Sequence, residues 1–510
     1  MHTKILSAAT IGINAHLVEI EVDLSFGMLV FNIVGLPDAA IKESRQRILT
    51  ALKNCGFRLP ERKITVNLAP ADLKKEGTLF DLPIALGIVQ AAEQVFLPKE
   101  FLQETLILGE LSLDGSIKPV RGVLPIARGA RAQGKKRLIV PAANAQEAAL
   151  IPGIEVIAPT HLIELIAYLR NEATIPPTAP ATLEAFVAAT LLDFDEVSGQ
   201  GEAKRALQIA AAGRHNILFI GPPGAGKTML AQRLFTIMPP LSFEEMIDIS
   251  AIYSICGKLP SQQLITERPF RAPHHSISQA GLVGGGSFPQ PGEISLAHHG
   301  ILFLDEFVEF RRMALEALRQ PLEHQEVCIS RAQQAVTFPA SFLLVAALNP
   351  CPCGFRGDKK KPCTCLPAQV KRYIDRLSGP LLDRIDLQVA VQPVEFSAIA
   401  KREVNLSSKQ LVQQVSVAVE RQKKRFGAQG VWNAHLSPRD IEKHCGMSEG
   451  AHATIKIAFD KLGLSMRGYH KILKIARTIA DLTDQDLIER EHVQEAITYR
   501  SLEQHLERLR

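Results

Sequence analysis

The chain has 510 residues, of which 46% are hydrophobic and 22% are charged. These values are close to those of soluble globular proteins, and they exclude a wholly disordered chain, a collagen and a small disulfide-stapled protein. The net charge of +5 is mild, so it permits a polyanionic partner without requiring one. At about 150 residues per domain, the length favours roughly three domains.

The sequence predicts a cytoplasmic protein without a membrane span. No apolar run reaches the roughly 18 residues that a transmembrane helix needs. The N-terminus carries an early lysine but no continuous apolar stretch, so it does not resemble a signal peptide. Structural disulfides are therefore not expected.

Changes in composition divide the chain into four segments. Residues 1–170 mix strand and helix patterns, and the Pro- and Ala-rich stretch 171–184 is typical of an extended linker. Residues 185–400 alternate short apolar runs with helical patterns, which predicts an α/β domain with a parallel sheet. Residues 401–510 have helical periodicity, which predicts a helical lid domain.

The individual elements follow from the local patterns. In the first segment we expect a strand, a helix and a second strand, at 63–70, 82–93 and 137–142. Continuous apolar runs predict buried strands of the parallel sheet at 216–221, 301–306 and 341–349. Residues 326–339 predict two short strands around a polar turn. Helices are expected in the last segment at 410–426, 439–445, 470–482 and 491–500.

A phosphate-binding loop follows the first of these apolar runs. The motif G-x-x-x-x-G-K-[ST] lies between a strand pattern and a helix pattern, so a chance match is a poor explanation. Its glycines let backbone N–H groups surround phosphate oxygens, its lysine reaches the β and γ phosphates, and its threonine binds Mg²⁺. The residues predicted to bind ATP are Gly221, Pro222, Pro223, Gly224, Ala225, Gly226, Lys227 and Thr228.

The next two apolar runs end in polar residues that suit ATP hydrolysis. Asp305 is predicted to hold Mg²⁺ through water, and Glu306 to polarise the water that attacks the γ-phosphate. Asn349 could hydrogen-bond that water or the γ-phosphate, although an asparagine that merely opens a turn is the alternative. ATP and Mg²⁺ are therefore the expected cofactors.

Two arginines are candidates to stabilise transition-state charge. Arg384 is either a finger that reaches the γ-phosphate of a neighbouring subunit or the partner of Asp383 or Asp386 in an ion pair. Arg467 opens a helical segment of the lid and could close over the nucleotide, with Arg477 as the competing candidate.

Four cysteines are clustered as two C-x-C pairs, Cys351 with Cys353 and Cys363 with Cys365. Four thiolates are a donor set that structural zinc prefers, although its usual spacing is C-x-x-C. The loop between the pairs is polar and basic, so a metal would be needed to order it. Structural zinc is the prediction, and free thiols or disulfides are the alternatives.

Together these motifs resemble the AAA+ ATPases of the branch that contains magnesium chelatase and MCM-type motors, and within it the Mg-chelatase-like ComM/YifB family. The resemblance covers essentially the whole chain. The strings that carry it are VGLPDAAIKESRQRI (34–48), GTLFDLPIAL (77–86), FRAPHHSISQAGLVGGG (270–286), LNPCPCG (348–354) and GPLLDRID (379–386).

The resemblance implies a hexameric, ATP-driven DNA helicase that promotes branch migration in homologous recombination and natural transformation. Its partners would be single-stranded and branched DNA, and recombination proteins. The alternative is a magnesium-chelatase-type motor that remodels a protein or a metal-insertion complex. The resemblance also identifies 270–295 as an insert in the second helix, and 326–339 as a hairpin. In related ring motors both point into the channel, where Arg331 would meet DNA phosphate; solvated surface loops are the alternative.

Residues 1–170 resemble the proteolytic domain of Lon, most clearly through GELSLDGSIKPVRGV (109–123). Leu79 and Leu124 occupy the positions of the Lon nucleophilic serine and its lysine, which predicts a domain without protease activity. A basic string follows, and it forms either a solvated face or a track for DNA. Its candidate DNA contacts are Arg128, Arg131, Lys135 and Lys136, with Arg137 beside them.

Overall fold

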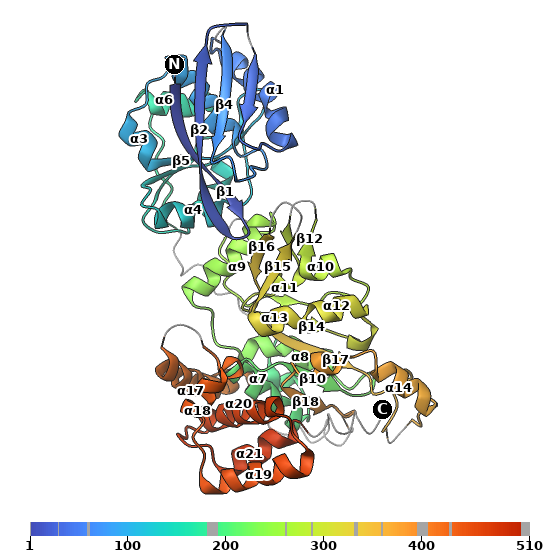
Figure 1. The fold of residues 1–510 in the computed structure, drawn as a ribbon. Coiled ribbons are helices and arrows are strands. Elements are labelled where there is room, and N and C mark those ends of the chain that lie inside the picture. Colours follow the sequence, from blue (N-terminus) through green and yellow to red (C-terminus); the bar gives the residue numbers. More distant parts are fainter. Residues whose placement is uncertain are drawn as a thin grey trace. The chain divides into compact units, whose positions relative to one another are not determined.

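A computed structural model describes residues 2–28, 30–58, 62–180, 192–260, 263–286, 289–330, 335–358, 361–394, 406–427 and 431–500. The chain divides into two compact units. The first comprises Met1–Val187 with Phe243–Thr266, and the second comprises Ala188–Ser242 with Glu267–Arg510. Figure 1 shows the elements of each unit coloured along the sequence.

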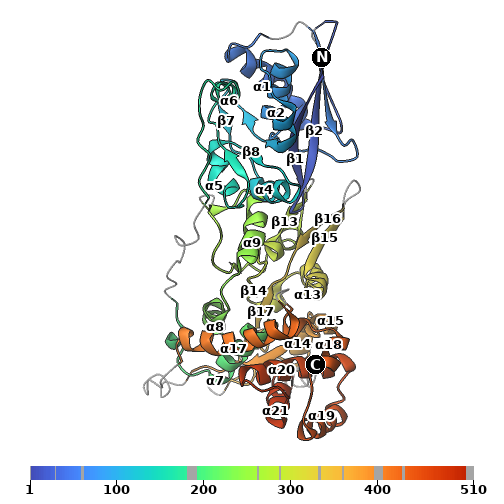
Figure 2. The same ribbon diagram turned by 90° about the vertical axis from the view of Figure 1, so that its left-hand side faces the viewer.

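The first unit contains a four-stranded sheet with the order β1-β2-β4-β3. Its strands are β1 (His2–Ile11), β2 (Asn14–Ser25), β3 (Phe31–Val34) and β4 (Lys63–Ala69). β1 and β2 form a long antiparallel hairpin, and β3 pairs with β4 in parallel. Helices α1 (Ala39–Asn54) and α2 (Asp81–Ala91) lie on one face of this sheet (Figure 2). Ten of the residues of α2 are buried, which explains its strongly apolar sequence.

A second, parallel sheet completes the core of this unit, with the order β5-β8-β9. Its strands are β5 (Thr105–Ile107), β8 (Arg137–Ile139) and β9 (Glu155–Ile157). The short elements around it are α3 (Lys99–Glu104), β6 (Glu110–Leu111), β7 (Ile117–Lys118), α4 (Val123–Ala132), α5 (Ala145–Ala148) and α6 (Leu162–Leu169). The strands predicted at 63–70 and 137–142 and the helix predicted at 82–93 are confirmed.

Helix α9 (Phe243–Ile255) packs with this first unit, although the sequence analysis placed it in the segment 185–400. Ile247 and Ala251 are buried in the same apolar cluster as residues of α4. The start of the predicted linker is also packed, since Ile175 is buried in the core and Thr178 donates a backbone hydrogen bond to Val156. Both segments pack against this unit because burial of their apolar side chains away from water is favourable.

The second unit is built on a five-stranded parallel sheet with the order β11-β14-β17-β10-β18. The strands are β11 (Phe270–Arg271), β14 (Ile301–Leu304), β17 (Leu343–Leu348), β10 (Ile217–Ile220) and β18 (Leu387–Ala390). All residues of β10, β14 and β17 are buried, which is why these strands are continuous apolar runs. The predicted α/β class is confirmed.

Helices and two hairpins surround this sheet. The helices are α7 (Gly201–Gly213), α8 (Lys227–Arg233), α10 (Gln279–Val283), α11 (Glu293–Leu296), α12 (Arg312–Ala317), α13 (Arg319–His324), α14 (Pro367–Ile374) and α15 (Gly379–Leu382). The insert contains the hairpin β12 (Gly284–Gly285) and β13 (Gln290–Pro291). The predicted hairpin is β15 (Glu326–Ser330) with β16 (Ala335–Pro339), and Arg331 at its turn lies outside the described residues.

The C-terminal part of the second unit is helical, as predicted. Its helices are α17 (Ser408–Phe426), α18 (Pro438–His444), α19 (Glu449–Leu462), α20 (Met466–Leu482) and α21 (Arg490–Thr498). Their apolar faces continue the core of the sheet, because Leu411 of α17 and Ile475 of α20 belong to the same buried cluster as Phe219 of β10. In the ranges that the structure describes, no helix has both the length and the apolar character of a membrane span.

Candidate nucleotide site

Three strands of the parallel sheet end at one edge, and the predicted nucleotide-binding residues follow them. The phosphate loop follows β10, the acidic pair follows β14 and Asn349 follows β17. Because β17 lies between β10 and β14, Asn349 lies between the loop and the acidic residues. The carboxyl edge of a parallel sheet is the place where such folds bind ligands. The structure therefore brings these residues together.

The phosphate loop has the backbone geometry that glycine permits. Gly224 and Gly226 have φ angles of +79° and +89°, in the left-handed region. A Cβ atom on Gly221 would lie 2.1 Å from the carbonyl oxygen of Val391, so the loop approaches the chain after β18 too closely for any side chain. The loop leads directly into α8, whose first residue is Lys227.

Lys227 is folded back against its own loop. Its Nζ donates to the carbonyl oxygens of Gly221 at 2.6 Å and Pro222 at 3.1 Å, and to Oδ1 of Asn349 at 3.1 Å. Burial lowers the pKa of this ammonium group, and the charge of Asp305 opposes the shift. A bound phosphate would give this buried ammonium group an anionic partner.

The two acidic residues have different partners. Asp305 accepts a hydrogen bond of 2.9 Å from the hydroxyl of Thr228, so the two predicted Mg²⁺ residues are adjacent. Glu306 has a φ of 51°, and its Oε2 lies 3.0 Å from Nδ1 of His275. The sequence analysis did not identify His275, although the adjacent histidines in the string FRAPHHS were an available signal.

The four cysteines form a single cluster. Their sulfur atoms lie within 4.8 Å of one another, and the sulfurs of Cys351 and Cys353 are 3.3 Å apart. Backbone N–H groups of Phe355 and Thr364 lower the pKa of the Cys353 thiol, whereas burial raises the pKa of the Cys351 thiol. The donor set and its compactness fit a tetrahedral zinc site.

Gly354, which follows Cys353, lies close to the phosphate loop. A Cβ atom on Gly354 would lie 2.7 Å from the ring of Pro223 and 3.9 Å from the side chain of Asn349. An ion that orders the cysteines would therefore also restrict the phosphate loop and Asn349.

We expect about one zinc ion per chain, bound by the four cysteines, in protein purified without a metal-affinity tag. Serine at both Cys353 and Cys365 should remove the zinc and weaken ATP binding, because the support of the phosphate loop is lost. Cys328→Ser is the matched control, since Cys328 is exposed on β15. Elemental analysis and nucleotide titration measure both effects. Four titratable thiols in this cluster without zinc would contradict the prediction.

Arg384 lies at the opposite edge of the sheet from the phosphate loop. It precedes β18, and Asn216, which precedes the parallel neighbour β10, donates to its carbonyl oxygen at 3.1 Å. Its guanidinium pairs with Glu323 of α13, whereas the sequence analysis named Asp383 and Asp386 as the intrachain alternatives. Arg384 cannot reach the phosphate loop of its own chain, because β10 alone spans about 13 Å.

Arg467 lies beside Arg384, and the two line a cavity of about 520 Å³. Lys471 and Lys474 of α20 also line it, together with the carboxylates of Glu323, Asp383 and Asp386. Arg467 is exposed, whereas the competing Arg477 is fully buried. A lid residue that contacts the nucleotide of its own chain would have to lie at the carboxyl edge of the sheet, beside the phosphate loop. Arg384 and Arg467 therefore share a position that faces away from their own phosphate loop.

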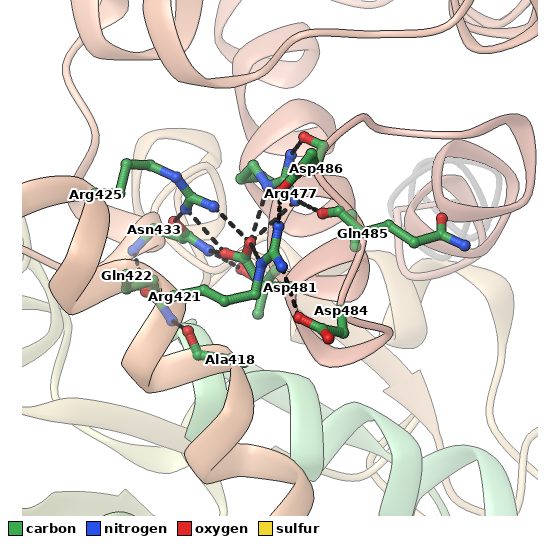
Figure 3. A network of polar contacts seen from close by, with 12 residues as sticks. Ala418, Arg421, Gln422, Arg425, Asn433, Arg477, Asp481, Asp484, Gln485 and Asp486 are labelled. Atoms are coloured by element: carbon green, nitrogen blue, oxygen red, sulfur yellow. Dashed lines mark hydrogen bonds and ion pairs between the residues drawn. The ribbon is translucent and has the colours of Figure 1, made fainter.

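Arg477 belongs to a buried network that joins α17 and α20 (Figure 3). The carboxylate of Asp481 lies 3.0 Å from Arg477 and 2.6 Å from Arg425. Arg477 also donates to the backbone carbonyls of Gln485 and Asp486. Its guanidinium is therefore engaged in holding the lid helices together.

We expect Arg477→Met to lower the free energy of unfolding by about 3 kcal/mol, because it leaves the buried Asp481 with one partner fewer. Arg467→Met should leave the melting temperature unchanged, since Arg467 is exposed, but should slow ATP hydrolysis. Thermal unfolding and an ATPase assay on the two variants test this contrast. An Arg477→Met protein as stable as the parent would be inconsistent with a structural role.

The basic cluster of the first unit is largely paired within that unit. The pairs are Arg128 with Asp248, Lys135 with the carbonyl of Gln103, Lys136 with Glu104 and Arg137 with Glu155. Arg131 is exposed. Exposed ion pairs are weak, so phosphate groups could compete for these side chains. These contacts are compatible with both alternatives of the sequence analysis, a solvated face and a DNA track.

The positions of the Lon catalytic pair are filled by packed aliphatic side chains. Leu124 is fully buried, and Leu79 packs against the same apolar cluster. The hydroxyl of Thr78, next to Leu79, donates to the carboxylate of Glu110. Neither leucine has a nucleophilic or basic group, so the two positions supply no protease chemistry.

Three family descriptions match consecutive parts of the chain. "Subunit ChlI of Mg-chelatase" matches residues 20–144, "Magnesium chelatase, subunit ChlI" matches 193–399, and "Magnesium chelatase, subunit ChlI C-terminal" matches 405–500. A local similarity to Lon protease 2 of Bacillus subtilis, 33% identical over 119 residues, covers 23% of this chain and 20% of that protein.

Two relatives match over almost their whole length. Competence protein ComM of Haemophilus influenzae is 43% identical, over 99% of this chain and 98% of that protein. The YifB protein of Escherichia coli is 42% identical, over 100% of this chain and 99% of that protein. The phosphate loop, the acidic pair and the parallel sheet agree with these matches, and the chain therefore belongs to the Mg-chelatase-like ComM/YifB family of AAA+ proteins.

Proposed function

We propose that the chain hydrolyses ATP with Mg²⁺ and uses the energy to move along DNA, promoting branch migration in homologous recombination and natural transformation. The observation that carries the ATPase is the meeting of Lys227, Asn349 and the Thr228–Asp305 pair at one edge of the sheet. The DNA substrate is supported by the full-length similarity to a protein named for competence.

The ring assembly is supported by the placement of the two arginines. Arg384 and Arg467 line one cavity at the edge of the sheet opposite their own phosphate loop. Guanidinium groups stabilise the charge of the phosphoryl-transfer transition state when a neighbouring subunit supplies them. A closed hexamer would place this cavity against the phosphate loop of the next subunit.

A second candidate is a magnesium-chelatase-type motor that remodels a protein or a metal-insertion complex. The observation that favours it is that three family descriptions named for magnesium chelatase match the chain. The similarity to a competence protein over 99% of the chain favours the DNA motor.

DNA should stimulate ATP hydrolysis, and DNA binding should weaken steeply with salt because each neutralised phosphate releases counterions. Arg331→Ala should lower the salt slope by about 1 and abolish strand displacement while ATP hydrolysis without DNA persists. Lys423→Ala removes one charge from an exposed ion pair on α17 and is the control.

Forked, single-stranded and four-way DNA should be compared at low salt in the same ATPase and binding assays. A chain that hydrolyses ATP but binds none of the three would contradict the DNA motor and favour the chelatase-type motor.

A further inference from the structure

Asp386 ends the string GPLLDRID, and its carboxylate binds two separate elements. Oδ1 lies 3.2 Å from Nζ of Lys471 on α20, and Oδ2 lies 3.2 Å from Nδ1 of His215, which precedes β10. Burial would raise the pKa of this carboxyl, but the charge of Lys471 and the hydrogen bond from His215 lower it. Asp386 is only 7% exposed. The residue that the sequence analysis named as a possible partner of Arg384 is thus a buried carboxylate bound to the lid.

The main chain of the same turn is held by neighbouring parts of the fold. Lys471 donates from Nζ to the carbonyl oxygen of Ile385 at 3.2 Å, and Arg500 donates to the same oxygen at 3.1 Å. Asn216 donates to the carbonyl oxygen of Arg384 at 3.1 Å. Three side chains therefore fix the backbone that carries Arg384, and two of them come from the C-terminal helical part of the chain.

Helix α20 carries Arg467 four residues before Lys471, so the two side chains lie on the same face of the helix. Both line the cavity that Arg384 also lines. Arg384, through a hydrogen bond, and Arg467, through its charge, both lower the pKa of Glu323, so both guanidinium groups lie near this carboxylate. The ion pair of Asp386 with Lys471 therefore links the turn of one arginine directly to the helix of the other.

We infer that Asp386 is a positioning residue whose ion pair with Lys471 locks helix α20 to the Arg384 turn. The two arginines, Arg384 and Arg467, are then presented to a neighbouring nucleotide as one unit. This inference rests on the proposed function, because it assumes that both arginines act on the next subunit of a ring. The pair should affect turnover and not nucleotide binding, since Asp386 precedes β18 and lies at the edge of the sheet opposite the phosphate loop.

The test measures ATP binding and steady-state hydrolysis by the full-length protein. Asp386→Asn keeps the size of the side chain and an oxygen for His215, but it removes the charge that holds Lys471. Turnover should fall about tenfold, within the roughly 10²-fold that displacement of a catalytic group by about 1 Å can cost. The Kd for ATP should not change.

Lys474→Met is the matched control. Lys474 lines the same cavity and lies on the same helix, but it donates to the carbonyl oxygen of Ala434 at 3.0 Å. This variant removes a positive charge from the cavity and leaves the ion pair of Asp386 with Lys471 intact. It should hydrolyse ATP at the parental rate.

A second variant keeps the test valid if the first one loses stability. Asp386→Asn leaves a buried ammonium group without its carboxylate, which is strongly destabilising. Combining Asp386→Asn with Lys471→Met removes both charges, so the fold should survive. Thermal unfolding verifies this, and turnover should stay as low as in the single variant.

Two readouts separate positioning from a structural role. In an Arg384→Ala background, Asp386→Asn should slow hydrolysis much less than in the parent, because one of the arginines that it positions is already absent. In mixed rings, Asp386→Asn chains should regain turnover from Lys227→Ala chains, which supply an intact Arg384 turn. A distortion of the nucleotide site within the Asp386→Asn chain would not be rescued in this way.

Parental turnover in a folded Asp386→Asn protein would overturn the inference, and so would an undiminished further loss in the Arg384→Ala background. An equal loss in Lys474→Met would also overturn it, because the effect would then come from the charge of the cavity. Failure of the proposed function gives a different result, since Arg384→Ala alone would then hydrolyse ATP at the parental rate.

Discussion

Glu306→Gln will bind ATP and retain it, with hydrolysis slowed by about 10²- to 10⁴-fold, the range expected for loss of a general base. The substitution keeps the shape of the side chain but removes the carboxylate that we expect to polarise the attacking water. The Thr228–Asp305 contact does not involve the Glu306 side chain, so Mg²⁺ and nucleotide binding should survive.

Lys227→Ala is the contrasting variant. It removes the buried ammonium that faces Gly221, Pro222 and Asn349, so both ATP binding and turnover should fall. Nucleotide titration and single-turnover hydrolysis separate the two variants. A Glu306→Gln protein with the parental rate would show that another group activates the water.

Strand positions and local motifs could be predicted from the sequence because they depend on neighbouring residues. The runs that became β10, β14 and β17 are apolar throughout, since both faces of each strand are covered. The turn chemistry of the phosphate loop is local too, since Gly224 and Gly226 fall where the backbone has positive φ. The order of these strands along one sheet then brought Lys227 to Asn349.

Side-chain partners across the fold could not be predicted in the same way. Arg384 has acidic neighbours in sequence, yet it pairs with Glu323, which only the packing of α13 brings near. Glu306 pairs with His275 because β11 lies beside β14. β11 is only two residues long, so the sequence did not predict this strand or its neighbour. Arg467 and Arg477 are both plausible lid arginines in sequence, and only their burial separates them.

Local sequence patterns also could not predict which unit a whole segment packs against. Helix α9 follows the phosphate-loop region in sequence but buries Ile247 and Ala251 in the first unit. The basic string at 128–137 has the composition of a nucleic-acid track, while its partners, Asp248 among them, come from distant positions. Composition shows the charge of a segment, whereas its pairing depends on the tertiary fold.

Arg384→Ala will bind ATP but hydrolyse it about 10³-fold more slowly, because in the proposed ring the γ-phosphate loses the guanidinium of the neighbouring subunit. The arginine cannot act on its own nucleotide, since it precedes β18 while the phosphate loop follows the parallel strand β10. In the described chain its side chain is 15% exposed and paired with Glu323, so it must extend past this partner to reach a neighbour.

Mixing Arg384→Ala chains with Lys227→Ala chains tests action between subunits. Each chain is inactive alone, but a junction that joins an intact Lys227 from one to an intact Arg384 from the other forms a complete site. Hydrolysis should therefore recover in mixed rings, in proportion to the number of such junctions. Chains that carry both substitutions are the control, because they contribute no intact half-site and should restore nothing. Verified mixed rings that stay inactive would place the function of Arg384 within its own chain, where Glu323 is its partner.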